Sequence, residues 1–357
     1  MKFLLAGLLL TIVCSLKAQD IHFSDYSNAY LFFNPAFTGY IPGKKAHRLT
    51  LAGRDQWTSA LGGNAYRTAA AAYEGRLCAD NRPGEFFSVG ARIASDWQGD
   101  PTLRRTAGHF SLGYTKTLRG GSGSPAVTIS AGAESGLIGY NIDVPDLTFD
   151  DQFNAPGVED EVLFSSSPMF MDVGLGASVY IDRSSRNKRW SNVRHINFGA
   201  ALKHINRPAI GFLGNTAPGN RSSDSTAVLN MRLNLQGGFT LDLNENSLTL
   251  LALHSWQRPH NETVVRAMFN FNSQTGGNLE DKSFSLGGGL RINDGVSGLA
   301  ADALILTVKW YTEKATLSIN GDVNISKFSA ATKGIGGIEF STAFYLGKNQ
   351  CVQCPQF

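Results

Sequence analysis

The strongest constraint on the fold of this chain is an alternation of apolar and polar residues between Ala227 and Gln236. Every second position carries an apolar side chain: Leu229, Met231, Leu233 and Leu235. Polar side chains occupy the positions between them: Asn230, Arg232, Asn234 and Gln236. Because successive side chains of a β-strand point to opposite faces, this stretch predicts a strand with one apolar and one polar face.

The same alternation recurs roughly every twenty residues up to the C-terminus and predicts fourteen strands. They are expected at 48–57, 65–76, 85–95, 103–118, 125–140, 169–181, 194–204, 227–241, 247–257, 262–272, 283–292, 301–311, 316–325 and 337–346. The two longest connections, 141–168 and 205–226, both follow odd-numbered strands, whereas those after even-numbered strands are short or moderate. An outer-membrane barrel has an even strand count, short periplasmic turns and longer outer loops. We therefore predict an all-β fold, a transmembrane antiparallel up-and-down β-barrel with both termini in the periplasm.

In such a barrel the apolar face of each strand meets lipid and the polar face points inward. The residues expected to face lipid on the opening stretch are Leu229, Met231, Leu233 and Leu235. The charged residues expected to project inward are Arg232, Arg266, Arg291, Lys309, Asp322 and Glu339. Mixed charges of this kind fit either a water-filled pore or an interior packed by hydrogen bonds. The strand at 247–257 is apolar on both faces, so alternation does not assign its inward side.

The N-terminal residues predict a secreted protein. Lys2 precedes an apolar run from Phe3 to Val13, and Ala18 stands at a cleavage position, so residues 1–18 read as a signal peptide. Residues 19–47 lack alternation and contain Pro35 and Pro42, which predicts a leader or plug ahead of the sheet. The barrel is expected at 48–346, and 347–357 form a periplasmic tail.

Composition and motifs argue against several classes of function. The net charge is +3, and no concentrated basic surface of the kind that binds nucleic acid is evident. None of the seven His stands in a metal-binding spacing such as H-E-x-x-H, and no G-x-S-x-G nucleophile motif is present. We predict no catalytic residues, no cofactor and no metal, although an enzyme with its acids and His on the barrel rim remains an alternative.

The cysteines are expected to gather at the periplasmic rim. Cys14 leaves with the signal peptide, while Cys78 follows the second strand and Cys351 and Cys354 follow the last. An oxidising compartment favours a disulfide among these three thiols. Cys78 could pair with Cys351 or with Cys354, or the last two could pair with each other.

Several short stretches together resemble a known family. They are QDIHFS at 19–24, NPAFTG at 34–39, RDQW at 54–57, NFGA at 197–200, GGLRIND at 288–294, DVNIS at 322–326, GGIE at 336–339 and the ending CPQF at 354–357. In this order they resemble the PorP/SprF family, outer-membrane components of the type IX secretion and gliding machinery of Bacteroidetes. Gly53 and Ile338 depart from the residues common in that family.

The resemblance implies a non-enzymatic barrel that binds periplasmic ring and peptidoglycan-linked proteins and helps secreted proteins reach or stay on the surface. We expect the partner contacts at the two rims. The candidate residues are Asn34, Pro35, Thr38, Gly39, Arg54, Gln56, Trp57, Arg183, Arg186, Lys188 and Arg189. A basic turn at 182–193 suggests an acidic periplasmic partner. The barrel alone would equally suit an outer-membrane porin or a small-solute transporter.

Overall fold

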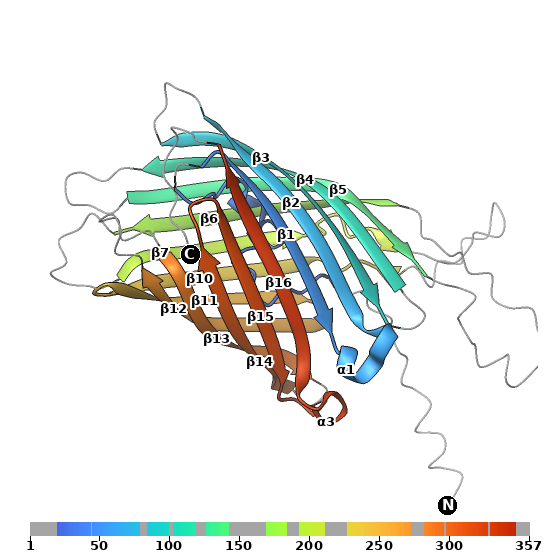
Figure 1. The fold of residues 1–357 in the computed structure, drawn as a ribbon. Helices are drawn as coiled ribbons and strands as arrows, with labels where there is room; N and C mark the ends of the chain where they lie inside the picture. The colour runs from blue at the N-terminus through green and yellow to red at the C-terminus, as the bar shows by residue number, and fades with distance from the viewer. Residues whose placement is uncertain are drawn as a thin grey trace, which may run out of the picture.

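A closed antiparallel barrel of fourteen strands forms the wall of the protein in the computed structural model (Figure 1). The structure describes residues 20–43, 45–78, 84–99, 103–118, 126–142, 169–183, 193–210, 227–272, 282–295, 298–327 and 329–347. The wall strands are β1 (His47–Gln56), β2 (Tyr66–Cys78), β3 (Glu85–Gln98), β4 (Leu103–Leu118), β5 (Ala126–Asn141), β6 (Phe170–Asp182), β7 (Val193–Lys203), β10 (Arg232–Leu243), β11 (Asn246–Gln257), β12 (His260–Asn272), β13 (Lys282–Gly295), β14 (Gly298–Tyr311), β15 (Ala315–Asn324) and β16 (Ile335–Leu346). Each strand pairs with its neighbour along the chain, and β1 pairs with β16 to close the wall.

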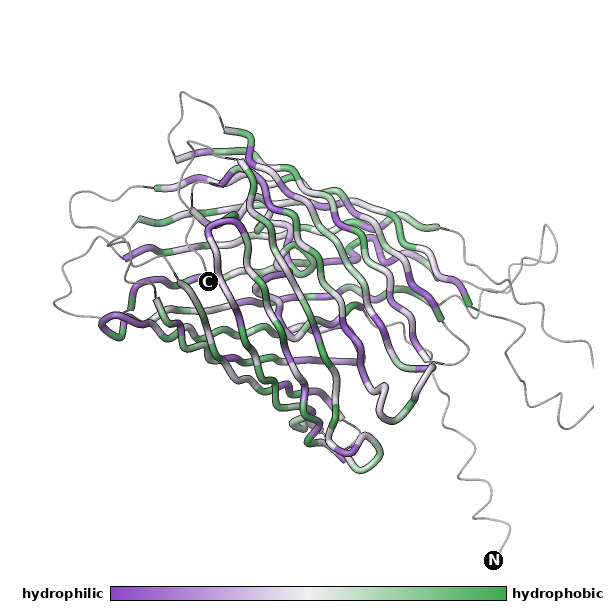
Figure 2. The backbone as a smooth tube through the Cα atoms, viewed as in Figure 1, coloured by the Kyte–Doolittle hydropathy of each residue, from purple (hydrophilic) through white to green (hydrophobic). Residues whose placement is uncertain are grey.

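The alternating pattern predicted this wall, and each of the fourteen predicted strands coincides with an observed one. Figure 2 shows hydrophobic and hydrophilic residues alternating along the strands. On β14 the side chains of Leu304, Leu306 and Trp310 are exposed on the outer surface, while Thr307 and Lys309 between them are buried. The six charged residues predicted to project inward are all buried, which confirms that prediction: Arg232, Arg266, Arg291, Lys309, Asp322 and Glu339.

The prediction was wrong at the start of the stretch from Ala227 to Gln236. Ala227–Val228 form β9, which pairs with β8 (Ala209–Ile210) in a separate two-stranded sheet, and β10 begins only at Arg232. Leu229 therefore does not face lipid but is 2% exposed in a cluster with Ile138 and Tyr140. Alternation could not locate this boundary, because it continues unbroken where the chain leaves the wall. Met231 and Leu235 are exposed as predicted, and Leu233 is partly exposed.

Residues 20–41, here called the plug, run along the inside of the barrel and include two short helices, η1 (Tyr30–Phe32) and η2 (Pro35–Phe37). Asp20 lies beside Arg105 and Arg232, each near the start of its strand. Ile41 packs on Ala343 and Tyr345, near the end of β16. The plug thus crosses the interior from one end of the barrel to the other.

Two names distinguish these ends. The loop end carries α1 (Thr58–Leu61) with η3 (Gly62–Asn64) and α3 (Ser329–Thr332), and the turn end carries the tight turns at 244–245 and 312–314. Asp20 lies at the loop end, whereas Gly347 follows β16 at the turn end. The first described residue, Asp20, therefore lies at the opposite end of the barrel from the last one, Gly347. The predicted periplasmic position of the two termini stays a prediction. No helix in the described ranges is long and apolar enough to cross a membrane.

Candidate functional site

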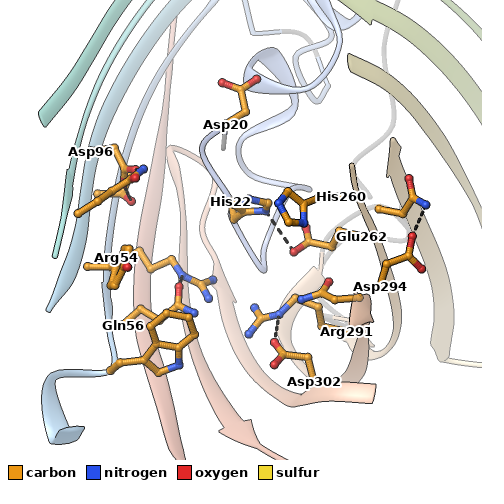
Figure 3. A pocket seen from close by; sticks show the side chains of 16 residues that line it. Asp20, His22, Arg54, Gln56, Asp96, His260, Glu262, Arg291, Asp294 and Asp302 are labelled. Carbon is orange, nitrogen blue, oxygen red and sulfur yellow. Dashed lines mark hydrogen bonds and ion pairs between the residues drawn. The ribbon is translucent and has the colours of Figure 1, made fainter. Parts of the chain in front are cut away.

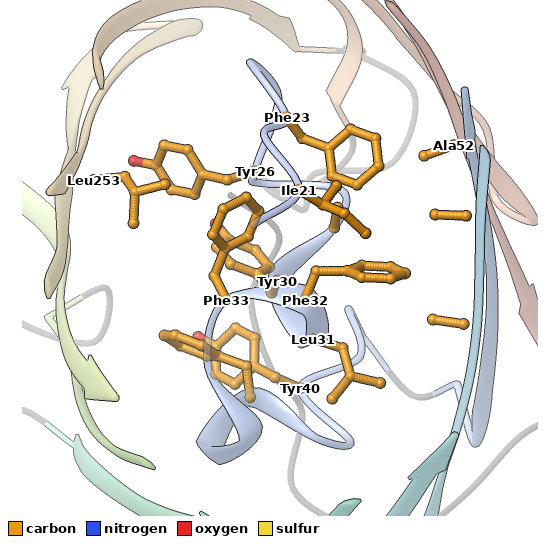
Figure 4. Packing of buried hydrophobic residues seen from close by; sticks show 14 of the residues in the cluster. Ile21, Phe23, Tyr26, Tyr30, Leu31, Phe32, Phe33, Tyr40, Ala52 and Leu253 are labelled. Carbon is orange, nitrogen blue, oxygen red and sulfur yellow. The ribbon is translucent and has the colours of Figure 1, made fainter. Parts of the chain in front are cut away.

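The plug fills the barrel with an apolar cluster at its centre (Figure 4). The plug residues in this cluster are Ile21, Phe23, Tyr26, Ala29, Tyr30, Leu31, Phe32, Phe33, Phe37 and Tyr40. The wall residues in this cluster include small residues on β1 to β3, among them Ala52, Ala70 and Ala72, as well as Leu251 and Leu253 on β11. These two leucines explain why residues 247–257 are apolar on both faces. One face of β11 meets lipid, and the other packs against the plug.

Charged groups of the wall hold the plug near Asp25. The Asp25 carboxylate is 2.7 Å from Arg266 and 2.8 Å from Lys309, and all three side chains are buried. Burial alone would raise the pKa of Asp25, but the positive charges of Lys309 and Arg266 hold it well below its usual range. Asp25 therefore stays ionised and compensates two buried cations. We call these three residues, with Ser24, the charged anchor.

Ser24 joins the same anchor to strands on either side of the seam between β1 and β16. Its amide donates to Glu339 at 2.7 Å, and its hydroxyl donates to Asp322 at 2.9 Å. Arg54 on β1 bridges both carboxylates, at 2.7 Å from Asp322 and 3.1 Å from Glu339. One plug residue thus links three wall strands, each of which meets it with an inward-facing charge.

A chain of alternating acids and histidines holds the first residue of the plug. Asp20 contacts Arg105 at 2.7 Å and His204 at 2.8 Å, and His204 contacts Asp172 at 2.8 Å. His109 contacts the other oxygen of Asp172 at 2.7 Å. Burial would raise the pKa of Asp20, but the charges of Arg105 and His204 lower it. Burial would lower the pKa of His204, but Asp20 and Asp172 raise it above its ordinary value.

Glycines of the wall receive the second half of the plug, Asn34 to Gly39. Gly113, Gly132 and Gly176 face each other across β4, β5 and β6. A Cβ added at Gly132 would overlap with the backbone carbonyl of Pro35, and one at Gly176 would overlap with the amide of Asn34. Glycine here permits the close approach of another backbone. We call this row of glycines the glycine groove.

Hydrogen bonds fix the plug in the glycine groove. Asn34 caps η2 through the amide of Ala36, at 2.9 Å, and its side-chain nitrogen donates to Gln236 at 3.0 Å. Thr38 donates to Ser111 at 2.9 Å. The carbonyls of plug residues are also satisfied by inward side chains, such as Lys203 on Phe32 and Asn234 on Phe33. Hydrogen bonds to the main chain of the plug therefore hold it in place, in addition to the ion pairs of its charged side chains.

These contacts decide where the predicted partner-binding residues lie. Asn34, Pro35, Thr38 and Gly39 were expected at the rim, and this was wrong, because they are buried in the middle of the barrel against the glycine groove. Their motif serves to dock the plug. Nothing in a stretch without alternation distinguishes an internal segment from a rim segment, so the sequence did not reveal this. The inward charges alone fitted either a water-filled pore or a packed interior. The structure shows that a hydrogen-bonded plug occupies the interior.

Other predicted residues have different positions. Arg54, Gln56 and Trp57 come together at the loop end, around the cavity described below. Arg183 directly follows β6 at the turn end and is partly exposed. Cys78 is the last residue of β2, but its side chain lies outside the described part of the chain. The remaining predicted residues and most of the two long loops lie outside it too, so the disulfide and the basic turn stay predictions: Arg186, Lys188, Arg189, Cys351 and Cys354.

A polar cavity of about 480 Å³ opens at the loop end, above the first residues of the plug (Figure 3). Asp20 and His22 of the plug line it, together with side chains from the ends of β1, β2, β3, β12, β13 and β14. Sequence reasoning did not find this cavity, because its residues come from six strands that only barrel closure brings together. Among the described residues, no group of three or more His, Cys, Asp or Glu is placed to hold a metal ion.

The solved structures to which this chain is similar share little sequence identity with it. CdiB from Acinetobacter baumannii is 9% identical with a TM-score of 0.43; the match covers 85% of this chain but only 60% of CdiB. A TodX mutant, a monoaromatic hydrocarbon channel, is 10% identical with a TM-score of 0.46, covering 90% of this chain and 94% of TodX. Omp33 of Acinetobacter baumannii is 9% identical with a TM-score of 0.36, covering 85% of this chain and all of Omp33. No curated protein matches the chain.

The family comparison is decisive. The family model described as type IX secretion system membrane protein PorP/SprF matches residues 15–342, nearly the whole chain. The match includes the plug and almost every strand of the wall. A closed barrel with an apolar outer face agrees with this assignment, since lipid is the solvent that such a face requires. The chain is therefore a member of the PorP/SprF family, an outer-membrane β-barrel protein of the type IX secretion system.

Proposed function

We propose that this barrel acts as a binding scaffold of the secretion system, which engages periplasmic machinery at its turn end and secreted proteins at its loop end. The observation that carries the proposal is the plug itself. A lumen filled by buried aromatic rings and ion pairs suits a rigid platform better than a solute pathway. Loops on such a platform commonly bind partners. Family membership supplies the context of secretion.

In this proposal the protein is not an enzyme, and the turn end faces the periplasm. Long connections are typical of the outer end of outer-membrane barrels, and the two longest ones here, from β5 to β6 and from β7 to β10, are both at the loop end. The partners we propose are ring and peptidoglycan-linked proteins on the periplasmic side and a secreted protein on the cell surface. Single cysteines at Ser59 in α1 and at Lys314 in the turn end would test the orientation. A membrane-impermeant maleimide added to intact cells should label the first position and not the second.

One deletion and one set of charge exchanges test the two rims separately. Removing 145–162 from the longest loop should leave barrel assembly intact but release the secreted protein into the medium. Replacing Arg183, Arg186, Lys188 and Arg189 with Glu should reduce recovery of periplasmic partners in pulldowns from native membranes, as measured by mass spectrometry. Lys314→Glu, an exposed charge change at the same end, is the matched control. If both rim variants keep surface attachment and partner recovery, the scaffold proposal fails.

The alternative function, a porin or small-solute transporter, makes an opposite prediction for ion flow. Purified intact protein in planar lipid bilayers should give no steady conductance, because the plug occupies the lumen. A variant lacking residues 20–41 should conduct, and it serves as the positive control once resistance to SDS without heating confirms that it folds. Steady conductance of the intact protein equal to that of the deletion variant would favour the porin.

A further inference from the structure

The cavity at the loop end carries unused hydrogen-bonding groups. Nη2 of Arg291 is buried without a hydrogen-bond partner in the described structure, and so are the Oδ1 atoms of Asn261 and Asn293. All three residues line the cavity, and Arg291 itself is only 3% exposed. Buried polar atoms without a partner are uncommon and call for an explanation. One donor and two acceptors without partners, on residues that surround one space, indicate that this space receives a polar ligand.

Two carboxylates of the lining also keep accepting capacity. Asp96 accepts from Thr68, at 2.6 Å, and from Gln98, while Asp294 accepts from Asn261. No ion pair with either carboxylate occurs among the described residues, in contrast to Asp302, which pairs with Arg291 at 2.9 Å. A carboxylate can accept about four hydrogen bonds. Asp96 and Asp294 therefore offer further acceptor positions from opposite walls of the cavity (Figure 3).

The charges of the lining exclude a simple ion as the preferred occupant. Five carboxylates line the cavity and disfavour an anion: Asp20, Asp96, Glu262, Asp294 and Asp302. Two guanidinium groups line it as well, and three of the carboxylates already have basic partners, Asp20 with Arg105, Glu262 with His22 and Asp302 with Arg291, which reduces the attraction for a cation. A neutral ligand that both donates and accepts hydrogen bonds satisfies both sets.

An aromatic surface completes the lining. Trp57 and Tyr66 both contribute to the cavity, and their rings meet edge to face with centroids 5.2 Å apart. Trp57 holds a left-handed backbone conformation, with φ of 64°, which is unusual for a bulky residue and fixes the direction in which its side chain leaves the turn before α1. An aromatic ring beside hydrogen-bonding groups suits a ligand with an apolar face and a polar edge.

We propose that this cavity is a saccharide-binding site. A sugar ring carries hydroxyl groups that each donate and accept, together with a C–H face that packs on an aromatic ring, and it is uncharged. The volume of about 480 Å³ falls within the range of small-molecule pockets. Since Asp20 and His22 of the plug line its inner side, the site accommodates a short glycan rather than a polypeptide passing through the barrel. The proposal does not depend on the scaffold function.

Direct binding to the intact purified protein tests the proposal. The protein is held in lauryldimethylamine oxide, a detergent without a sugar head group, and titrated with glucose, galactose, mannose, N-acetylglucosamine and maltotriose. Saturation-transfer difference NMR detects binding and isothermal titration calorimetry gives Kd. Spermidine is titrated in parallel as a cationic probe. We expect at least one saccharide to bind and spermidine not to compete with it.

Substitutions locate the binding. Trp57→Ala removes the aromatic face, and Asn293→Ala removes an acceptor that no described residue uses, so the second variant should fold even if the first does not. Each should raise Kd about tenfold or more. Trp310→Ala removes a tryptophan exposed on the outer wall and should leave Kd unchanged. The proposal is overturned if no saccharide binds, if spermidine alone binds, or if a bound saccharide is insensitive to both cavity substitutions.

Discussion

The charged anchor and the glycine groove hold two halves of one plug by opposite means. At Asp25 the wall contributes long charged side chains that reach inward to the carboxylate. At Asn34 to Gly39 the wall contributes no side chain at all at Gly132 and Gly176, so the two backbones come into contact. The anchor depends on charge compensation, whereas the contact of Asn34 and Pro35 with the glycine groove depends on shape. At the end of this second half charged wall residues act again, because Gly39 donates to Glu74 and accepts from Arg76. Each half can therefore be broken by a substitution that should not disturb the other.

The largest effect is expected at the charged anchor. Asp25→Ala leaves Arg266 and Lys309 buried without a counter-charge, which should lower the free energy of unfolding by about 3–5 kcal/mol. Urea folding titrations into lipid vesicles measure it. Combining Asp25→Ala with Lys309→Met should recover part of the loss, because one uncompensated cation is gone. A loss below 1 kcal/mol for Asp25→Ala would show that the anchor is solvated and does not hold the plug.

A substitution on the lipid face gives the next largest effect and separates the wall from the plug. Leu306→Arg, near the middle of β14, should cost about 2–4 kcal/mol, because the charge lies at the centre of the bilayer. Leu346→Arg at the last residue of β16 should cost only about 0–1 kcal/mol near the interface. Folding titrations compare the two. Equal costs would contradict the proposed position of the membrane along the strands.

Particular residues show what could be read from the sequence. The fourteen strands, the outward Leu235 and the inward Lys309 followed from alternation, because each strand has a different environment on its two faces. The burial of Leu229 could not be predicted from alternation, since a segment outside the wall can alternate in the same way. The plug did not follow either, because its structure is imposed by tertiary contacts and not by a local period.

The glycine groove illustrates the same limit. Gly132 and Gly176 reduce the β-propensity of their strands, and only the position of Pro35 and Asn34 explains why nothing larger is present. The cavity at the loop end was equally hidden, although three of its residues, Arg54, Gln56 and Trp57, had been selected from the family resemblance. Residues far apart in sequence acquire a joint role only when the barrel closes.

A third prediction concerns the groove. Gly132→Ala places a methyl group where the Pro35 carbonyl lies, and the resulting overpacking should cost about 1–3 kcal/mol. Gly321→Ala on β15 is the matched control, because a Cβ there meets no atom within 4 Å. Protease sensitivity of the plug should rise in the first variant and not in the second. If the two variants behave alike, contact with glycine does not position Asn34 to Gly39.

The smallest effect is expected from pH at the loop end of the plug, where Asp20 meets His204. The pKa of Asp20 is lowered in the fold, so its contribution to stability is fully present above the ordinary carboxyl value of about 3.9 and is lost only in stronger acid. The pKa of His204 is raised, so its contribution is fully present below about 6.5 and declines as the pH rises through the raised value. The stability that this pair contributes should therefore be greatest between these two pH values.

His204→Gln should remove the decline on the alkaline side in urea titrations across pH, whereas His254→Gln should retain it, because His254 contacts Thr263 rather than the plug. If the decline of stability at alkaline pH persists in His204→Gln, another group causes it. The charged anchor would then be the electrostatic attachment of the plug.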